Sequence, residues 1–182
     1  MKTGDLVLFS SDASFTRMFV RFTHVGLIVD DRLVLEMHRA GDRGTGHLRN
    51  YFEGGRPTGP KLYDLRARIA AYPGRVWIAP LLVRSSPPKM DHLSRYRDLE
   101  FDDAYVWRYL RSCVADRWFG LADRWFGHRK SPTSVFCAEF VGMVLRDAAG
   151  IDIDVGCLTP CSLASLPPFG APERVTCFVG RG

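Results

Sequence analysis

The sequence predicts an α+β domain with a mostly antiparallel sheet of about five to six strands packed on the helix that carries Cys137. Three observations predict it. Short strand-like apolar runs gather near both ends of the chain, two of these runs form a hairpin, and a strongly periodic helix covers residues 135–149. A length of 182 residues suits a single domain, residues 1–182, with one core.

The first part of the chain is dominated by strand patterns. Residues 6–9 (Leu-Val-Leu-Phe) lie between polar and turn-forming residues, which predicts a buried strand. Apolar side chains at helical spacing predict a short helix over 14–22. Residues 25–29 and 33–35 are joined by Asp-Asp-Arg at 30–32, and this pattern predicts a β-hairpin.

The next part alternates between loop and strand signals. Residues 39–60 contain six glycines and two prolines, which predicts a long irregular loop. A strand is expected at 62–65, followed by a short helix that ends at Ala71. Another strand is expected at 76–83, where Pro80 favours an edge position or a bulge because proline has no N–H for the sheet.

Helical patterns dominate the second half of the chain. Regularly spaced apolar residues predict a helix over 90–118 and a clearer one over 135–149. Ser134 is the expected N-cap of the second helix, and Gly150 is its expected stop. A loop is expected around residues 159–160, where a proline follows a threonine.

A last strand is expected at 174–179, and one short repeat precedes the clear helix. Six residues, Ala-Asp-Arg-Trp-Phe-Gly, occur at 115–120 and again at 122–127, which indicates a small tandem duplication. Its Trp-Phe pairs form either an apolar lip beside a binding cleft or a loop packed on the core. In the first interpretation, Trp118 and Trp125 contact substrate.

Composition narrows the possible classes of protein. No run approaches the roughly 20 apolar residues of a membrane span, and no signal-peptide pattern opens the chain, so neither is expected. Five scattered cysteines, an odd number, favour a reducing compartment and a cytoplasmic location. The charge of +5 is spread along the chain, which favours weak attraction to an anionic membrane surface over a specific nucleic-acid site.

Cys137 is the candidate nucleophile. It lies early in the predicted helix 135–149, where unpaired N–H groups and the helix dipole favour a thiolate. Val141 and Val144 follow it at helical spacing, so its side chain is expected on the buried face. A buried cysteine that only fills the core fits the helix pattern equally well.

His24 and Glu36 are the candidate partners of the cysteine. His24 opens the strand 25–29, and an imidazole near a thiol can act as its base. A satisfied polar histidine at a strand end is the simpler interpretation. Glu36 stands in an apolar run, and a buried acid needs a partner because its burial otherwise costs several kcal/mol.

The hairpin register decides whether these two side chains meet. With a three-residue loop at 30–32, residue 29 pairs with 33 and residue 26 pairs with 36. His24 and Glu36 then lie on one face as diagonal neighbours, and His38 lies across from His24 as the competing third member. A two-residue loop would put His24 and Glu36 on opposite faces.

These residues occur in an order that resembles a known family. Gly-Asp-Leu-Val at 4–7, Thr-His-Val-Gly-Leu-Ile-Val at 23–29, Leu-Glu at 35–36 and Phe-Cys-Ala-Glu-Phe-Val at 136–141 resemble the circularly permuted papain-like (NlpC-type) hydrolases. The chain looks most like their YiiX-like branch, which has relatives in bacteria and in large DNA viruses including poxviruses. Lecithin:retinol acyltransferase-like relatives share the spacing but carry a histidine where Glu36 stands.

The resemblance covers most of the chain, including Tyr-Asp-Leu at 63–65 and Leu-Thr-Pro at 158–160, and leaves out about 39–60 and 112–131. It implies a permuted papain-like fold and a Cys137–His24–Glu36 triad. It also implies acyl chemistry on an amide, ester or thioester. A virion-associated location becomes an alternative to the cytoplasm. The backbone N–H of Cys137 would hold the oxyanion, with Tyr63 or a residue near His24 as a second donor.

Three functions therefore compete. The first is an amidase- or peptidase-like thiol hydrolase, and the second is a lipid-directed acyltransferase or phospholipase at a membrane surface. The third is a catalytically silent binding module of the same fold. No cofactor and no metal are expected, since the pair Cys157 and Cys161 lacks the second close pair that a zinc site usually has. Nothing in the sequence indicates the oligomeric state.

Overall fold

The computed structural model describes residues 1–12, 21–38, 58–83, 93–101, 134–155 and 158–176. The expected helix at 14–22 and the glycine-rich loop lie mostly outside the described residues. Of the last strand expected at 174–179, the structure describes residues 174–176, and of these only Arg174 lies in a strand. The duplicated segment with Trp118 and Trp125 lies outside the described residues altogether.

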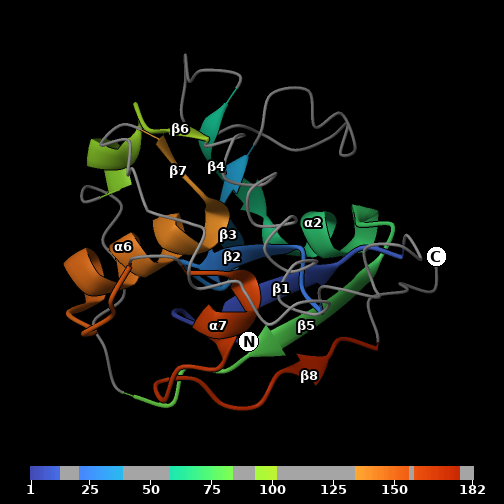
Figure 1. Ribbon diagram of the computed structural model, residues 1–182. Helices are drawn as coiled ribbons and strands as arrows, with labels where there is room; N and C mark the ends of the chain where they lie inside the picture. Colours follow the sequence, from blue (N-terminus) through green and yellow to red (C-terminus); the bar gives the residue numbers. More distant parts are fainter. Residues whose placement is uncertain (13–20, 39–57, 84–92, 102–133, 156–157, 177–182) are drawn as a thin grey trace, which may run out of the picture.

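The described residues form a mixed α+β structure with a mostly antiparallel six-stranded sheet, as the sequence predicts (Figure 1). The strand order is β4-β3-β2-β1-β5-β8, and each recorded pairing within it is antiparallel. Its strands are β1 (Leu6–Ser10), β2 (His24–Ile28), β3 (Leu33–His38), β4 (Gly59–Asp64), β5 (Arg75–Ala79) and β8 (Glu173–Arg174). A separate parallel pair joins β6 (Glu100–Phe101) to β7 (Ser134–Val135).

Two helices cover opposite faces of this sheet. Because successive side chains of a strand point to opposite faces, alternate residues of β1 and β2 enter different cores. One core joins Leu8, Val25 and Leu27 to helix α6 (Cys137–Ala149). The other joins Phe9 and Ile28 to helix α2 (Leu65–Ala71). The face on which a strand residue lies therefore decides which helix it can meet.

The hairpin between β2 and β3 has the three-residue loop and the register expected from the sequence. Gly26 lies opposite Glu36, and the N–H of Val29 donates to the carbonyl of Leu33 at 3.0 Å. The Asp30 carboxylate accepts hydrogen bonds from the N–H groups of residues 32 and 33 at 2.7 and 2.6 Å, which stabilises the turn. Local turn chemistry and strand alternation thus set the register together.

Gly26 makes room for the side chain across from it. A Cβ at Gly26 would lie 2.8 Å from Cγ of Glu36 and 2.7 Å from Cγ2 of Val34. These distances are shorter than real Cβ contacts, so any side chain there would push Glu36 away.

Two expected strands have different bounds. β4 begins at Gly59 rather than at residue 62, so the end of the predicted loop pairs with β3 instead. β5 ends at Ala79, before Pro80, and it lies inside the sheet between β1 and β8. The prediction of an edge position or a bulge was wrong, because the strand stops at the residue before the proline.

The helical pattern over 90–118 can be compared only at residues 93–101, and it is borne out only at their start. Leu93 is helical and Ser94–Tyr96 form a 3-10 helix, η1, but Glu100–Phe101 form β6. The N–H of Leu99 donates to the carbonyl of Tyr96, which closes a turn. Apolar residues at spacings of three and four also suit a 3-10 turn followed by a strand, so the pattern misled.

The ends of the remaining helices correct the predictions around them. α6 begins at Cys137 with Phe136 as its N-cap residue, because Ser134 belongs to β7. Gly150 does end the helix, with a left-handed φ of 66° that favours glycine. Residues 160–164 form a short helix, α7 (Pro160–Ala164), rather than a loop, and Thr159 caps it by accepting from the N–H of Ser162 at 3.0 Å.

Candidate active site

Glu36 is the centre of a buried polar cluster on the α2 face of the sheet. Its side chain is 0% exposed. The Nε2 atoms of His24 and His38 lie 2.9 and 2.7 Å from its Oε2 atom. Arg68 of α2 donates from Nε to Oε1 at 2.9 Å and from Nη2 to Oε2 at 3.0 Å. The partner that Glu36 was expected to need is therefore His24, joined by two further groups.

The cluster keeps Glu36 ionised. Burial, the largest single influence, raises the pKa of this carboxyl, but hydrogen bonds from His24 and His38 and the charge of Arg68 together hold it well below its usual range. An ionised carboxylate only accepts hydrogen bonds, so both histidines must carry their proton on Nε2. Nδ1 of neutral His24 is then unprotonated and basic.

His24 is neutral in this environment. Burial lowers its pKa most, the hydrogen bond to Glu36 opposes that shift, and the charges of His38 and Arg68 add to it. Its ring lies 5.5 Å from the ring of Phe9 and 5.2 Å from that of His38, centroid to centroid. The His24 side chain is 19% exposed, and it is more exposed than those of His38 and Glu36.

Arg68 was not singled out from the sequence. Its guanidinium carbon lies 4.8 Å from the ring centre of Phe9 and 5.6 Å from those of Tyr63 and Tyr72, so aromatic faces surround it. A signal was present, because Arg68 follows Leu65 by three residues and so falls on the buried face of a short amphipathic helix. A charge on such a face implies a buried partner of opposite sign.

Cys137 lies on the other face of the sheet, at the first position of α6. It is 1% exposed and belongs to the apolar core formed with Val25 and Leu27. Burial raises the pKa of its thiol to about 12, the charge of Glu36 adds to that, and backbone hydrogen bonding at Val25 and Ala138 opposes it. The expectation of a resting thiolate at the helix start was wrong, because the loss of hydration outweighs the helix terminus.

The sulfur and the His24 ring approach the same strand from opposite sides. Val25, whose backbone hydrogen-bonds the sulfur, directly follows His24. Within the described part of the chain, no hydrogen bond joins Sγ of Cys137 to the ring of His24. The sulfur is also absent from the group of ligand atoms of His24, Glu36 and His38 that lie within 4.8 Å of one another. The structure brings His24 and Glu36 together, and it places Cys137 beside the backbone that carries His24.

The other predicted site residues lie as follows. Tyr63 on β4 is buried beside His38, with ring centres 4.9 Å apart, and its side chain is on the α2 face rather than the Cys137 face. His38 bonds to Glu36 and not to His24, so the histidines flank the carboxylate. Trp118 and Trp125 lie outside the described residues.

The donor set of the cluster fits a hydrogen-bonded carboxylate better than a metal centre. Two imidazole nitrogens and one carboxylate oxygen are ligand types that suit zinc. Arg68, however, places a full positive charge on the same carboxylate, and a divalent cation at Oε2 would have to displace both histidine hydrogen bonds beside it. Of the pair Cys157 and Cys161, the structure describes Cys161, whose thiol is free and half-buried.

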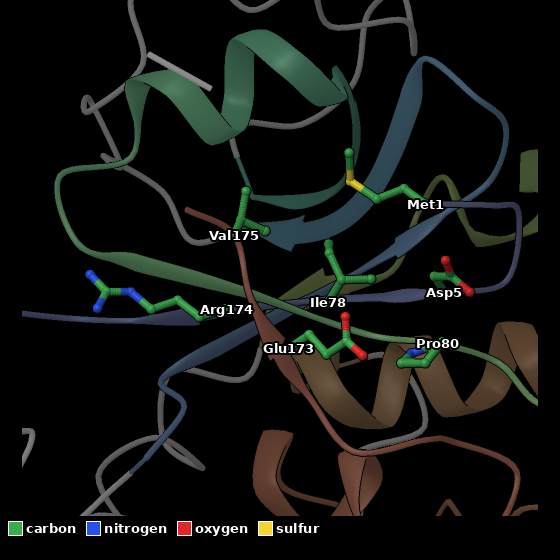
Figure 2. Close-up of a pocket in the computed structure, with 7 residues that line it drawn as sticks. All are labelled: Met1, Asp5, Ile78, Pro80, Glu173, Arg174 and Val175. Atoms are coloured by element: carbon green, nitrogen blue, oxygen red, sulfur yellow. The ribbon is translucent and has the colours of Figure 1, made fainter. Parts of the chain in front are cut away.

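A pocket of about 220 Å³ lies elsewhere, between the first residues of the chain and β8 (Figure 2). Asp5, Glu173 and Arg174 are among the residues that line it. The Asp5 carboxylate already accepts hydrogen bonds from the N–H groups of Leu81 at 2.9 Å and Lys2 at 2.7 Å. Asp5 thus anchors the start of the chain to the end of β5, and the pocket shares no residue with the Glu36 cluster.

Comparison with known proteins adds no relative. The chain matches no family model, no curated protein and no solved structure. None of the helices in the described residues is long and apolar enough to cross a membrane.

Proposed function

We propose that the protein is a thiol hydrolase of permuted papain-like fold that cleaves an amide or ester bond. In this proposal Cys137 is the nucleophile, His24 its base and Glu36 the group that orients the base. One observation carries it: the buried hydrogen bond between Nε2 of His24 and Glu36, which holds the ring as a base whose Nδ1 is unprotonated. The sulfur lies against the backbone of the next residue, Val25.

The proposed reaction starts from a neutral pair, because the pKa of the Cys137 thiol is raised by burial and that of His24 is lowered by burial. Nδ1 of His24 takes the thiol proton as Sγ attacks the carbonyl carbon, and a carbon–sulfur bond forms. The imidazolium, stabilised by Glu36, returns the proton to the leaving amine or alkoxide. Water then attacks the thioester, with His24 again as base, and releases the acid and the thiol.

The oxyanion of each tetrahedral intermediate needs donors close to the sulfur. As the first residue of α6, Cys137 has a backbone N–H without an intrahelical acceptor, and this group suits the role. The reaction also requires Nδ1 of His24 and Sγ of Cys137 to come within hydrogen-bond distance in the substrate complex. Because the two groups lie on opposite sides of β2, the His24 ring has to turn past the end of the strand, of which it is the first residue, when substrate binds.

Site-resolved alkylation tests the nucleophile. The protein is treated with iodoacetamide between pH 5 and 9, and the modification rate at each cysteine is read by peptide mass spectrometry. We expect Cys137 to react, and we expect His24→Ala to slow it at least about tenfold because a base contributes about 10² or more to such steps. The Cys161 rate, measured in the same samples, is the matched control. If His24→Ala leaves the modification rate of Cys137 unchanged, the assignment of His24 as the base of Cys137 is wrong.

A second candidate is the catalytically silent module of the same fold. The raised pKa of the Cys137 thiol favours this version, as does the absence of a hydrogen bond between Sγ and the His24 ring in the described part of the chain. Incubation with p-nitrophenyl acetate separates the two candidates, because only a competent nucleophile forms an acetyl-enzyme that intact-mass spectrometry detects at Cys137 and that Cys137→Ser abolishes. Peptide, amide-linked and lipid-like substrates all remain compatible with the chemistry, and flotation with anionic vesicles tests the lipid-surface version.

A further inference from the structure

Arg68 has a role at the candidate site that neither the sequence pattern nor the proposed triad assigns. It comes from α2, which covers the sheet face on which Glu36 lies, and reaches Glu36 with two donors, Nε at 2.9 Å and Nη2 at 3.0 Å. The contact is buried, with 5% of the Arg68 side chain and 0% of the Glu36 side chain exposed. A two-pronged bond of this kind fixes both the position and the ionisation of a carboxylate.

The arginine is itself held in place. Asp64, the N-cap of α2, accepts from the N–H of Ala67 at 2.8 Å, so the helix start next to Arg68 is anchored. The rings of Phe9, Tyr63 and Tyr72 surround the guanidinium and restrict its rotamers. The guanidinium of Arg68 is therefore held in position to bind Glu36 before any substrate arrives.

Among the described residues, the charges of Glu36 and Arg68 cancel, so His24 can stay neutral while it donates from Nε2 to Oε2 of Glu36. Without Arg68, the negative charge of Glu36 would favour a proton on the neighbouring imidazole. An imidazolium cannot accept a proton from a thiol.

We propose that Arg68 is a positioning residue that holds Glu36 ionised as an acceptor and so keeps His24 neutral, with its proton on Nε2 and Nδ1 available as the base. This inference deepens the proposed function and rests on it only for the identity of the base. The charged and titratable groups that act on His24 are Glu36 and His38 from β3 and Arg68 from α2. The Cys137 thiol lies on the opposite face of the sheet, and burial raises its pKa to about 12.

Nuclear magnetic resonance of the histidine ring nitrogens tests the inference without any substrate. Signals are assigned with His24→Asn and His38→Asn and followed from pH 5 to 9. In the wild-type protein we expect the Nε2–H tautomer for both rings at pH 7.5. In Arg68→Gln we expect the midpoint of the His24 titration to rise by about one pH unit or more, the size of shift typical of a charge at this distance.

Two further variants distinguish a positioning role of Arg68 from a role in fold stability alone. Arg68→Lys keeps the charge and should restore the midpoint close to that of the wild-type protein, although it loses the two-pronged bond. Arg66→Gln removes an exposed arginine from the same helix and should leave the midpoint unchanged. An unchanged midpoint in folded Arg68→Gln, checked by circular dichroism, overturns the inference.

The outcome stays decisive if Arg68→Gln fails to fold. The wild-type spectrum alone contradicts the inference if either histidine carries its proton on Nδ1 at pH 7.5. The proposed function fails separately, through the alkylation and acetyl-enzyme experiments. If Cys137 is reactive, the acid limb of its pH–rate profile should move upward in Arg68→Gln by the same amount as the His24 midpoint.

Discussion

The two faces of the sheet at β2 and β3 treat buried ionisable groups in opposite ways. On the α2 face, Glu36 is charged, and each of its oxygens accepts from a histidine or an arginine. On the α6 face, the thiol of Cys137 is surrounded by apolar side chains and is held neutral by a raised pKa of about 12 that burial causes. A buried charge persists where donors converge on it, and a buried acid without such donors keeps its proton.

The contrast is also one of sequence distance. The charged face unites residues of β2, β3 and α2, with Arg68 lying 32 positions after Glu36. The thiol face unites β2 with a helix more than a hundred residues later. The proposed chemistry requires His24 from one face and Cys137 from the other. His24 belongs to strand β2 and Cys137 contacts this strand, so β2 links the two faces. Changes that affect one face and spare the other test that arrangement.

Removal of the central carboxylate should have the largest effect. Glu36→Ala removes the carboxylate that Arg68 and both histidines bind, and breaking a buried ion pair in this way costs about 3–5 kcal/mol of unfolding free energy. Cys137→Ala, on the other face, should cost about 1 kcal/mol because it removes one small apolar group. Urea denaturation at pH 7.5 measures both. Equal losses for the two variants would contradict the contrast between the faces.

The two faces should lose stability at opposite ends of the pH scale. The folded pKa of His24 is lowered from 6.5, chiefly by burial, so the unfolded chain binds its proton first and stability falls as pH drops below about 6.5. The folded pKa of Glu36 is held well below 4.5 by its donors and Arg68, against burial, so its contribution is lost as pH drops below about 4.5. Urea midpoints between pH 4 and 8 measure this, and His24→Asn should flatten the upper part of the curve.

The loss of stability at alkaline pH should come from Cys137 on the α6 face. Burial raises the pKa of the Cys137 thiol from 9.0 to about 12, so above about pH 9 the unfolded chain loses a proton that the folded chain retains. Stability should therefore fall as pH rises past 9, and Cys137→Ala should reduce that fall. If Cys137→Ala changes only the acid side, the assignment of the two ends is wrong.

Crowding at Gly26 should produce an intermediate effect. Gly26→Ala brings a methyl group against Glu36 and Val34 and should cost about 1–3 kcal/mol, as overpacking does. It should also disturb the histidine ring signals, because Glu36 has to move. Gly150→Ala is the control: its φ of 66° is unfavourable for alanine, so it should cost about 1 kcal/mol while leaving the histidine signals unchanged.

The smallest effect is expected at the cap of α2. Asp64→Ala removes the side chain that accepts from Ala67 and should cost about 1 kcal/mol. Because α2 carries Arg68, the variant should also weaken the hold on Glu36, seen as a small rise in the His24 midpoint. Loss at the Thr159 cap of α7, made by Thr159→Ala, should lower stability without moving that midpoint. If both variants shift the His24 midpoint equally, the effect does not depend on how α2 positions Arg68.

Several features of the site followed from sequence because they are local. The His24–Glu36 contact depends on a three-residue turn and on strand alternation, and neighbouring residues around Asp30 set both. The Gly150 stop is local in the same sense, since left-handed backbone favours glycine. The helical pattern held at residues 93–96 and failed at 100–101, because spacings of three and four do not distinguish a continuous helix from a 3-10 turn followed by a strand.

By itself, the sequence determined an antiparallel hairpin, which puts His24, Glu36 and His38 on one face when its loop has three residues, and a helix that buries Cys137. Only the tertiary structure decided that α2 delivers Arg68 to Glu36, that α6 covers the opposite face, and that Cys137 is a protonated thiol. Register and alternation are properties of neighbouring residues. Desolvation and charge pairing depend on which distant elements exclude water from a group, and no local pattern contains that information.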